Sequence, residues 1–233
     1  MILYDTDYST IYKQMSAERE KVEYWKQKNA KKVLKQFRDS PEVPIFYHEI
    51  RTMPTTNNKY LLWYYAMTRD ECEEGLCYAG AVLLLHDKQG KRVAICLKTL
   101  SEMNSINAIV DTLQIFSGHF FSRYKERYPY LKEQDPISVM VQFFGRNGGY
   151  MNEVNYNDFT LEKDRKEGGS AWGMDDGVTL ATKNWIEVDN KKIFVARHHT
   201  FLSRKELKPD QAAVLPSQEE MRARLLHHFN YNP

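Results

Sequence analysis

The hydrophobic pattern predicts a long N-terminal helix followed by a β-rich region. Residues 12–37 contain no proline or glycine, and their apolar side chains recur at three- and four-residue spacing in one stripe. Pro41 ends this helix, because a residue that precedes proline is driven out of the α region. We therefore expect a helical segment in residues 1–40 and a single α+β domain in residues 41–233.

The next region changes to the patterns of β-strands. Residues 60–67 are a continuous aromatic and aliphatic run, which is typical of a strand. Residues 79–87 and 91–99 flank a short turn that contains Gly90, and they predict a β-hairpin. Residues 108–116 fit a further strand, with a helix as the alternative. Together these segments predict an antiparallel meander with one face buried against helices.

Two short helices follow the meander. Ser117 is placed to cap a helix that runs from His119 to Arg127. Residues 137–144 predict a second helix, with Pro136 at its first position.

The last third of the chain returns to strands. Residues 146–169 are polar and rich in glycine and asparagine, which predicts a long loop. Residues 177–182 and 185–200 predict strands, and serine–x–x–glutamate patterns at Ser203 and Ser217 indicate capping boxes that open C-terminal helices. The predicted fold class is α+β, a twisted antiparallel sheet packed against helices with a long N-terminal helix.

Composition and charge narrow the function classes. Hydrophobic residues make up 42% of the 233 positions, which is a globular composition, and the net charge is only +2. Binding to nucleic acid must therefore depend on local patches. One such patch lies between Lys13 and Arg38, where nine Lys or Arg residues face three Glu residues. It is either a solvated outer helix face or an electrostatic rail for a nucleic-acid backbone.

The sequence predicts no metal, no other cofactor and no membrane partner. Cys72, Cys77 and Cys96 lack the paired spacing of a zinc site, and we expect them to be reduced thiols. The longest apolar run, residues 79–85, is far shorter than the roughly 18 residues of a membrane span. The first nine residues lack the features of a signal peptide, so we expect a cytoplasmic location.

One segment combines groups suited to phosphate chemistry. His119, Arg123 and Arg127 lie at i, i+4 and i+8 and share one face of the predicted helix. Ser117 and the first turn add unpaired backbone N–H groups and the positive end of the helix dipole, which favour anions. Metal-free RNA cleavage needs a proton acceptor, cations for the transition state and a proton donor. We therefore expect His119 to be catalytic, and Ser117, Arg123 and Arg127 to bind phosphate.

A second group could complete this site. His198, His199 and Thr200 lie near the end of the strand predicted around residues 193–201, and we expect one of them to supply the second acid or phosphate contact. Strand alternation places His198 on the face of Thr200 and His199 on the face of Phe201.

A purely structural interpretation of both groups stays open. His119 can be a partly buried capping residue, and Arg123 can pair with Glu126 or Glu133 on the surface. In the strand, one histidine can be exposed and the other packed.

Several familiar active-site motifs are absent from the sequence. Asp175-Asp176-Gly177 is typical of a turn, and the glycine-rich residues 145–149 lack the lysine and hydroxyl ending of a P-loop. Neither a Gly-x-Ser-x-Gly elbow nor a His-Glu-x-x-His motif occurs, which argues against the hydrolases that use them.

The order of these segments resembles a pattern in uncharacterised bacterial proteins and in the barnase–EndoU–colicin–RelE group of small, toxin-like ribonucleases. The resemblance rests on His119-x3-Arg123-x3-Arg127 after a strand, then a later strand that ends in His199-Thr200-Phe201. It covers residues 116–203 and implies metal-free RNA cleavage by the helix histidine, with the arginines binding phosphate.

Three function classes remain from the sequence. The first is RNA phosphodiester cleavage or phosphate binding, with RNA as partner. The second is a non-catalytic nucleic-acid or protein adaptor that uses the basic N-terminal helix. The third is an interaction subunit whose many Tyr and Phe residues serve a protein interface. The sequence fixes neither the oligomeric state nor the substrate.

Overall fold

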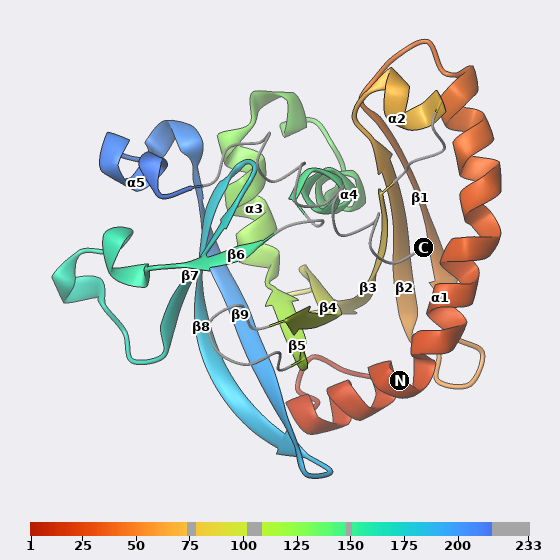
Figure 1. The fold of residues 1–233 in the computed structure, drawn as a ribbon. Helices are drawn as coiled ribbons and strands as arrows, with labels where there is room; N and C mark the ends of the chain where they lie inside the picture. Colours follow the sequence, from red (N-terminus) through yellow and green to blue (C-terminus); the bar gives the residue numbers. More distant parts are fainter. Residues whose placement is uncertain (74–77, 102–108, 148–150, 216–233) are drawn as a thin grey trace.

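The computed structural model describes residues 1–73, 78–101, 109–147 and 151–215 (Figure 1). Their strands form a single nine-stranded sheet in the order β1-β2-β3-β4-β5-β9-β8-β7-β6. The strands are β1 (Ile45–Thr52), β2 (Lys59–Ala66), β3 (Tyr78–His86), β4 (Arg92–Ser101), β5 (Ile109–Phe116), β6 (Asn152–Val154), β7 (Gly169–Met174), β8 (Gly177–Val188) and β9 (Lys191–Ser203). The helices are α1 (Tyr8–Asp39), α2 (Arg69–Glu73), α3 (Gly118–Arg127), α4 (Pro136–Asn147) and α5 (Pro209–Ala213).

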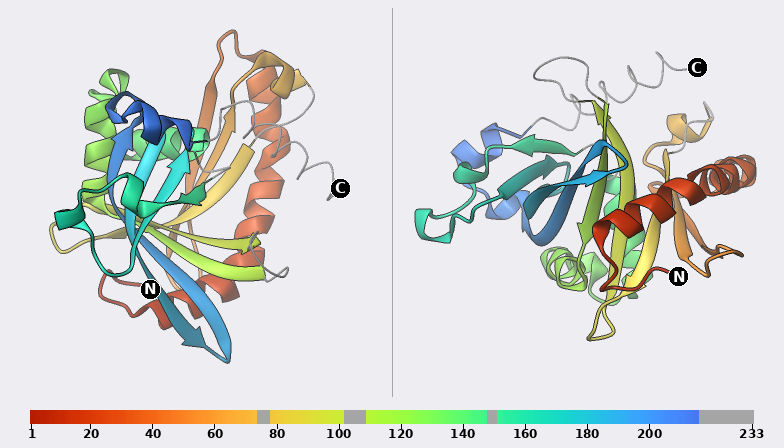
Figure 2. Two further views of the ribbon diagram at one scale, coloured as in Figure 1. Left: turned by 60° about the vertical axis from the view of Figure 1, so that its left-hand side comes forward. Right: turned by 90° about the horizontal axis from the view of Figure 1, so that it is seen from below.

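The sheet consists of two antiparallel meanders, β1 to β5 and β6 to β9, that meet at a parallel pair. Strands β5 and β9 run in the same direction, and Thr112 pairs with Phe194 while Phe116 pairs with His198. The segment between the meanders forms α3 and α4, which pack on one face of the sheet, while α1 packs on the other (Figures 1 and 2). The predicted α+β class and the long N-terminal helix are confirmed.

Helix α1 packs onto the sheet through one apolar stripe. Its buried residues, Ile11, Tyr12, Met15, Glu18, Val22, Trp25, Val33 and Phe37, recur at three- and four-residue spacing with one longer interval. The apolar members join side chains of β2 to β5 and β9 in one core. The helix begins at the cap Asp7, whose side chain accepts a 2.9 Å hydrogen bond from the backbone N–H of Thr10.

One buried carboxylate ties α1 to the β1–β2 hairpin. Glu18 is 5% exposed and accepts hydrogen bonds from Thr56 Oγ1 (2.5 Å), Asn58 Nδ2 (3.0 Å) and Tyr60 OH (2.5 Å). Burial and the hydrogen bond to Glu18 raise the pKa of Tyr60 above its ordinary value. Glu18 is therefore the hydrogen-bond acceptor on which these donors depend.

We expect Glu18→Ala to lower the free energy of unfolding by about 2 kcal/mol, because it leaves buried donors without an acceptor. Urea denaturation followed by circular dichroism measures this loss. Glu20→Ala is the matched control, since Glu20 is exposed on the same helix and its removal should change stability by less than about 0.5 kcal/mol. Equal losses in the two variants would contradict the prediction.

Three strands were not predicted from the sequence. Strand β1 precedes the first predicted strand, and β6 and β7 lie in or next to the segment predicted as a long loop. The capping box of Ser203 and Glu206 is present, but it opens a single 3-10 turn (Arg204–Glu206) rather than the predicted C-terminal helix. The second predicted box, at Ser217, lies outside the described residues.

Candidate functional site

The helix that carries the sequence-predicted site forms as expected. Ser117 caps α3, and its hydroxyl accepts a 3.2 Å hydrogen bond from the backbone N–H of Phe120. Phe120, Phe121 and Tyr124 are buried on the inner side of α3. His119 is exposed on the outer side. Ser117 therefore acts as a helix cap, which the structural interpretation of this segment requires.

The two arginines on α3 are paired with carboxylates of the protein. Arg123 Nη1 lies 2.9 Å from Glu126 Oε2, which is the surface pair that the alternative interpretation expects. Arg127 contacts the same oxygen at 3.3 Å and Glu206 at 3.1 Å. A phosphate at this face would have to displace these carboxylates.

His198 is sealed inside the protein. It is 0% exposed, and its ring stacks on Phe116 at a centroid distance of 4.3 Å. Its Nδ1 lies 2.5 Å from Thr179 Oγ1, and burial, with Lys98 and His199 as lesser causes, lowers its pKa to about 3. A group held neutral and away from solvent cannot exchange protons with a substrate in this conformation.

A β-bulge places the next residues differently from the alternation expected for a regular strand. Leu180 pairs with Thr200 and Ala181 with His198, so His199 is the extra residue in β9. As a result His198 and Phe201 lie in the same core, where both contact Phe120. The expectation that His199 shares the face of Phe201 is therefore wrong. His199 is exposed and half-buried Thr200 follows it.

The catalytic set predicted from the sequence thus divides between separate environments. His119, Arg123 and Arg127 lie on α3, His198 lies in the core, and His199 bonds to Thr182 Oγ1 at 2.9 Å. Catalysis by these residues stays a prediction. A different set of basic side chains lines open space in the protein.

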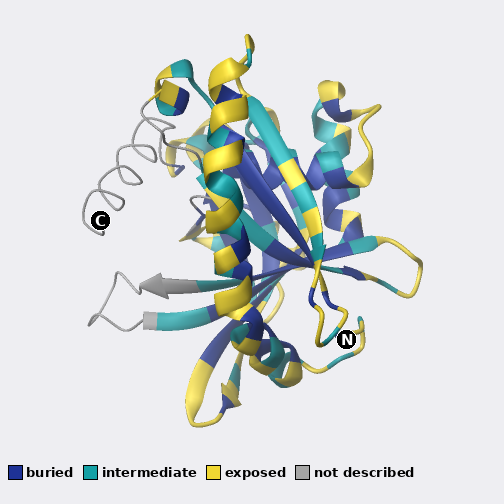
Figure 3. Cartoon of the chain, turned by 90° about the vertical axis from the view of Figure 1, so that its right-hand side faces the viewer, coloured by how far each residue is buried: buried dark blue, intermediate teal, exposed yellow. Residues whose placement is uncertain are grey.

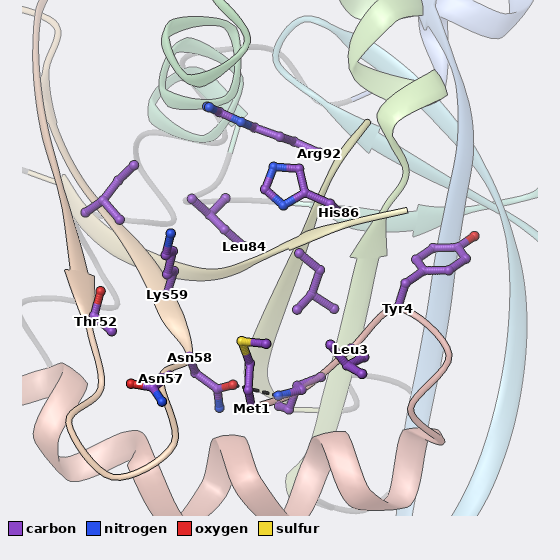
Figure 4. Close-up of a pocket in the computed structure, with 13 residues that line it drawn as sticks. Met1, Leu3, Tyr4, Thr52, Asn57, Asn58, Lys59, Leu84, His86 and Arg92 are labelled. Atoms are coloured by element: carbon purple, nitrogen blue, oxygen red, sulfur yellow. Dashed lines mark hydrogen bonds between the residues drawn. The ribbon is translucent and has the colours of Figure 1, made fainter. Parts of the chain in front are cut away.

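A hollow of about 430 Å³ lies at one end of strands β1 to β4, between these strand ends and the first residues of the chain (Figure 4). Figure 4 shows Arg92 and His86 above the hollow, Lys59 beside it, and Met1 and Leu3 below. The strand register explains the grouping, because His86 pairs with Arg92 across the β3–β4 hairpin. Side chains directly opposite each other share a sheet face.

The chain before α1 forms the floor of this hollow. The backbone N–H of Ile2 donates a 2.8 Å hydrogen bond to Asn58 Oδ1, which fixes the segment against the β1–β2 turn (Figure 4). Leu3 and Ile50 remain 55% and 47% exposed beside it. The hollow therefore combines an apolar wall with a basic rim.

A second hollow of about 340 Å³ lies at the start of α3 and shares Arg92 with the first. Lys91 and Lys125 add two more cations to it. A Cβ on Gly118 would lie 2.5 Å from the Lys91 Cβ, so glycine lets α3 begin directly against the entry to β4. Lys125 donates a 2.8 Å hydrogen bond to the Gln134 carbonyl, which holds it at the hollow.

We call the two hollows together the basic groove and define it by Lys59, His86, Lys91, Arg92 and Lys125. Of the described residues that line it, none is acidic. Within the part of the chain that the structure describes, none of these five side chains forms an ion pair, and four of them are Lys or Arg. The groove therefore presents positive charge that no ion pair with the described residues neutralises.

The sequence contained a partial signal for this site. Lys91-Arg92 directly follow the Gly90 turn, and the hairpin around it is predicted from the sequence. The register that joins Lys59 and His86 to Arg92, and the contact of α3 with Lys91, depend on tertiary structure.

Near the opposite ends of α3 and α4, the β7–β8 turn carries a polar cluster that the sequence analysis did not identify. Asp176 is 4% exposed and accepts hydrogen bonds from Arg146 Nη2 (2.6 Å), Asn147 Nδ2 (2.9 Å) and Tyr124 OH (2.6 Å). Its own backbone N–H donates to Asn147 Oδ1 at 2.9 Å, and its carbonyl accepts from Tyr128 OH at 2.9 Å. The hydrogen-bond partners of Asp176 come from α3, from α4 and from the residue after α3. This cluster therefore fixes α3 and α4 to the second meander.

The described residues contain no cluster of side chains suited to metal binding or thiol chemistry. Those residues contain no group of three or more His, Cys, Asp or Glu side chains placed to hold a metal ion. Cys72 and Cys96 are buried free cysteines, and burial raises the pKa of the Cys96 thiol to about 12. Cys77 lies outside the described residues. No helix in the described segments is long and apolar enough to span a bilayer.

Comparison with known proteins finds no protein-family model, no curated protein and no solved structure that matches this chain. The geometry of the basic groove is therefore the feature that bears on function.

Proposed function

We propose that the protein binds the phosphate backbone of a single-stranded nucleic acid, RNA in the first instance, in the basic groove. The observation that carries this proposal is the set of four Lys and Arg side chains, joined by His86, that line two adjoining hollows and form no ion pair with the described residues. Neutralising phosphates with Lys and Arg supplies most of the non-specific affinity of proteins for nucleic acid.

The shape of the groove favours a chain over an isolated anion. Arg92 lies between two hollows, and each hollow has apolar walls, with Ile50 and Leu84 in the first and Val139 and Met140 in the second. A single strand offers that alternation, since a phosphate can meet Arg92 while the flanking sugars and bases contact the apolar walls. Volumes of about 430 and 340 Å³ lie in the range of pockets that hold ligands of nucleotide size.

The composition of the groove favours binding over cleavage. Metal-free RNA cleavage uses one group that accepts a proton and another that donates one. Of the described residues that line the groove, His86 is the one histidine, and His119 does not line either hollow. We therefore assign the groove a binding role and leave cleavage as an outcome of the experiment.

The test compares wild type with a triple variant, Lys59→Gln, Arg92→Gln and Lys125→Gln, by fluorescence anisotropy on a labelled mixed-sequence RNA. We expect binding to weaken by about 10- to 100-fold at low salt, and the slope of log affinity against log salt to become shallower by about 2. The matched control changes three exposed lysines elsewhere, Lys163, Lys191 and Lys192, to Gln and should bind like wild type.

Two results would overturn the proposal. One is a loss of RNA affinity in the control variant equal to that in the groove variant. The other is a groove variant that keeps the wild-type affinity for RNA. The same RNA is incubated in excess EDTA to detect cleavage. Cleavage to 2′,3′-cyclic phosphates that His119→Ala abolishes would instead support the ribonuclease activity predicted from the sequence.

A further inference from the structure

The outward side of α1 carries a row of lysines that do not line the basic groove. Lys21, Lys28, Lys31, Lys32 and Lys35 are all exposed, and we call these five residues the α1 ridge. Figure 3 shows exposed positions along the outward side of α1 and buried ones against the sheet. The spacing of three, four and seven residues places the ridge on one side of the helix, over a length of about 21 Å.

The described residues form no ion pair with this ridge, although they pair with other cations of the same helix. Lys13 lies 2.8 Å from Asp189 and Lys26 lies 2.8 Å from Glu23. In the described segments none of the five ridge lysines forms an ion pair. The net charge of the whole chain is only +2, so the positive charge is concentrated locally.

The arrangement of the ridge destabilises the helix in the absence of a partner. Lys28 and Lys32, and likewise Lys31 and Lys35, are like charges four residues apart, and such pairs repel across one helical turn. A solvated helix that is stable by itself usually alternates the sign of its charges instead. A bound polyanion would neutralise these charges and relieve the repulsion between them.

The chemistry of the ridge selects the kind of polyanion. Its one large exposed ring is Tyr24, 51% exposed, with the ammonium groups of Lys21 and Lys28 at 5.2 and 5.9 Å from the ring centroid. A helix that inserts into a membrane surface presents a row of apolar side chains, and a surface that binds single strands presents several stacking rings. A straight row of cations without either feature fits a rigid, regularly charged backbone.

We infer that the α1 ridge binds the phosphate backbone of a double-helical nucleic acid. This surface is separate from the basic groove and does not depend on the function proposed for it. None of the five ridge lysines lines either hollow of the groove.

The experiment replaces all five ridge lysines with glutamine, which keeps helix propensity and removes charge. The control replaces five exposed lysines elsewhere, Lys132, Lys163, Lys191, Lys192 and Lys205, and so has the same net charge. Labelled 20-base-pair DNA and RNA duplexes are titrated against both. We expect the ridge variant to bind either duplex at least about 30-fold more weakly at low salt, with a salt slope shallower by about 4, and the control to bind like wild type.

Three results would overturn the inference. The first is a wild-type protein that binds neither duplex. The second is a control variant that loses as much duplex affinity as the ridge variant. The third is unchanged duplex binding in the ridge variant together with lost binding to vesicles containing phosphatidylserine, which would assign the ridge to an anionic membrane surface. Circular dichroism confirms that α1 is intact in the variant. The groove triple variant should keep its duplex affinity, so failure of either proposal is distinguishable from failure of the other.

Discussion

Replacing Asp176 with alanine is expected to lower the free energy of unfolding by about 3 to 5 kcal/mol. The carboxylate is 4% exposed, and it accepts from Arg146, Asn147 and Tyr124. Without it the half-buried Arg146 guanidinium loses its counter-charge, and the buried Tyr124 hydroxyl and Asn147 amide lose an acceptor. Removal of one partner from a buried pair is costly, because the other charge stays away from water without compensation.

Chemical denaturation followed by tryptophan fluorescence measures this loss. Glu153→Ala serves as the control, since Glu153 and its partner Lys183 are 42% and 39% exposed and such surface pairs contribute about 1 kcal/mol or less. Asp176→Asn should fall between wild type and alanine, because it keeps the shape but not the charge. If Asp176→Ala cost no more than Glu153→Ala, the cluster would not anchor α3 and α4 as described.

Stability is expected to fall by about 2 kcal/mol between pH 7 and pH 5 because of His198 alone. Burial first, and then Lys98 and His199, lower the pKa of His198 to about 3 in the folded protein, whereas the unfolded chain titrates near the ordinary value of 6.5. As the pH falls below 6.5, His198 binds a proton in the unfolded state but not in the folded state. Proton binding therefore stabilises the unfolded state. The contribution of His198 is therefore full above pH 6.5 and is lost as the pH falls toward 3.

The variant His198→Asn tests this origin, because asparagine can keep a hydrogen bond to Thr179 and does not titrate. We expect it to be less stable than wild type at pH 7 but to show a flatter pH profile, by about 2 kcal/mol over the same interval. His119→Asn, on the exposed side of α3, should keep the wild-type profile. A wild-type profile that is flat from pH 7 to pH 5, or a slope that survives His198→Asn, would refute the assignment.

The sequence was sufficient for elements whose boundaries are set locally. Helix α1 lacks breakers and repeats one apolar stripe, α3 begins at a serine cap, and α4 begins at a proline. The β3–β4 hairpin was predicted because Gly90, which adopts a φ of 75°, marks its turn between two apolar runs.

The unpredicted strands owe their conformation to tertiary pairing. Strand β7 has the sequence Gly-Ser-Ala-Trp-Gly-Met, which has little strand propensity of its own, and its register with β8 holds it in place. At Gly169 an added Cβ would lie 2.3 Å from the Tyr156 ring, so the residue that weakens the strand signal is required by packing.

The candidate site was less predictable than the fold, since partners distant in sequence decide it. Helical spacing correctly places His119, Arg123 and Arg127 along α3, but Glu206, which pairs with Arg127, comes from the 3-10 turn that follows β9. The single-residue bulge at His199 changes which side chains face the core, and strand alternation gives no sign of it. Conversely, Lys59 and Arg92 line the same hollow because β3 pairs with both β2 and β4.

The parallel pair of β5 and β9 has a consequence for how the chain folds. Each meander is closed by turns between strands that are neighbours in sequence, and such contacts form quickly because little chain entropy is lost. The pairing of Thr112 with Phe194 instead closes a loop that contains α3, α4 and most of the second meander. We therefore expect this junction to form late, with φ-values near zero for core side chains such as Leu113 and Val195. Mutations there should speed unfolding and leave the folding rate almost unchanged.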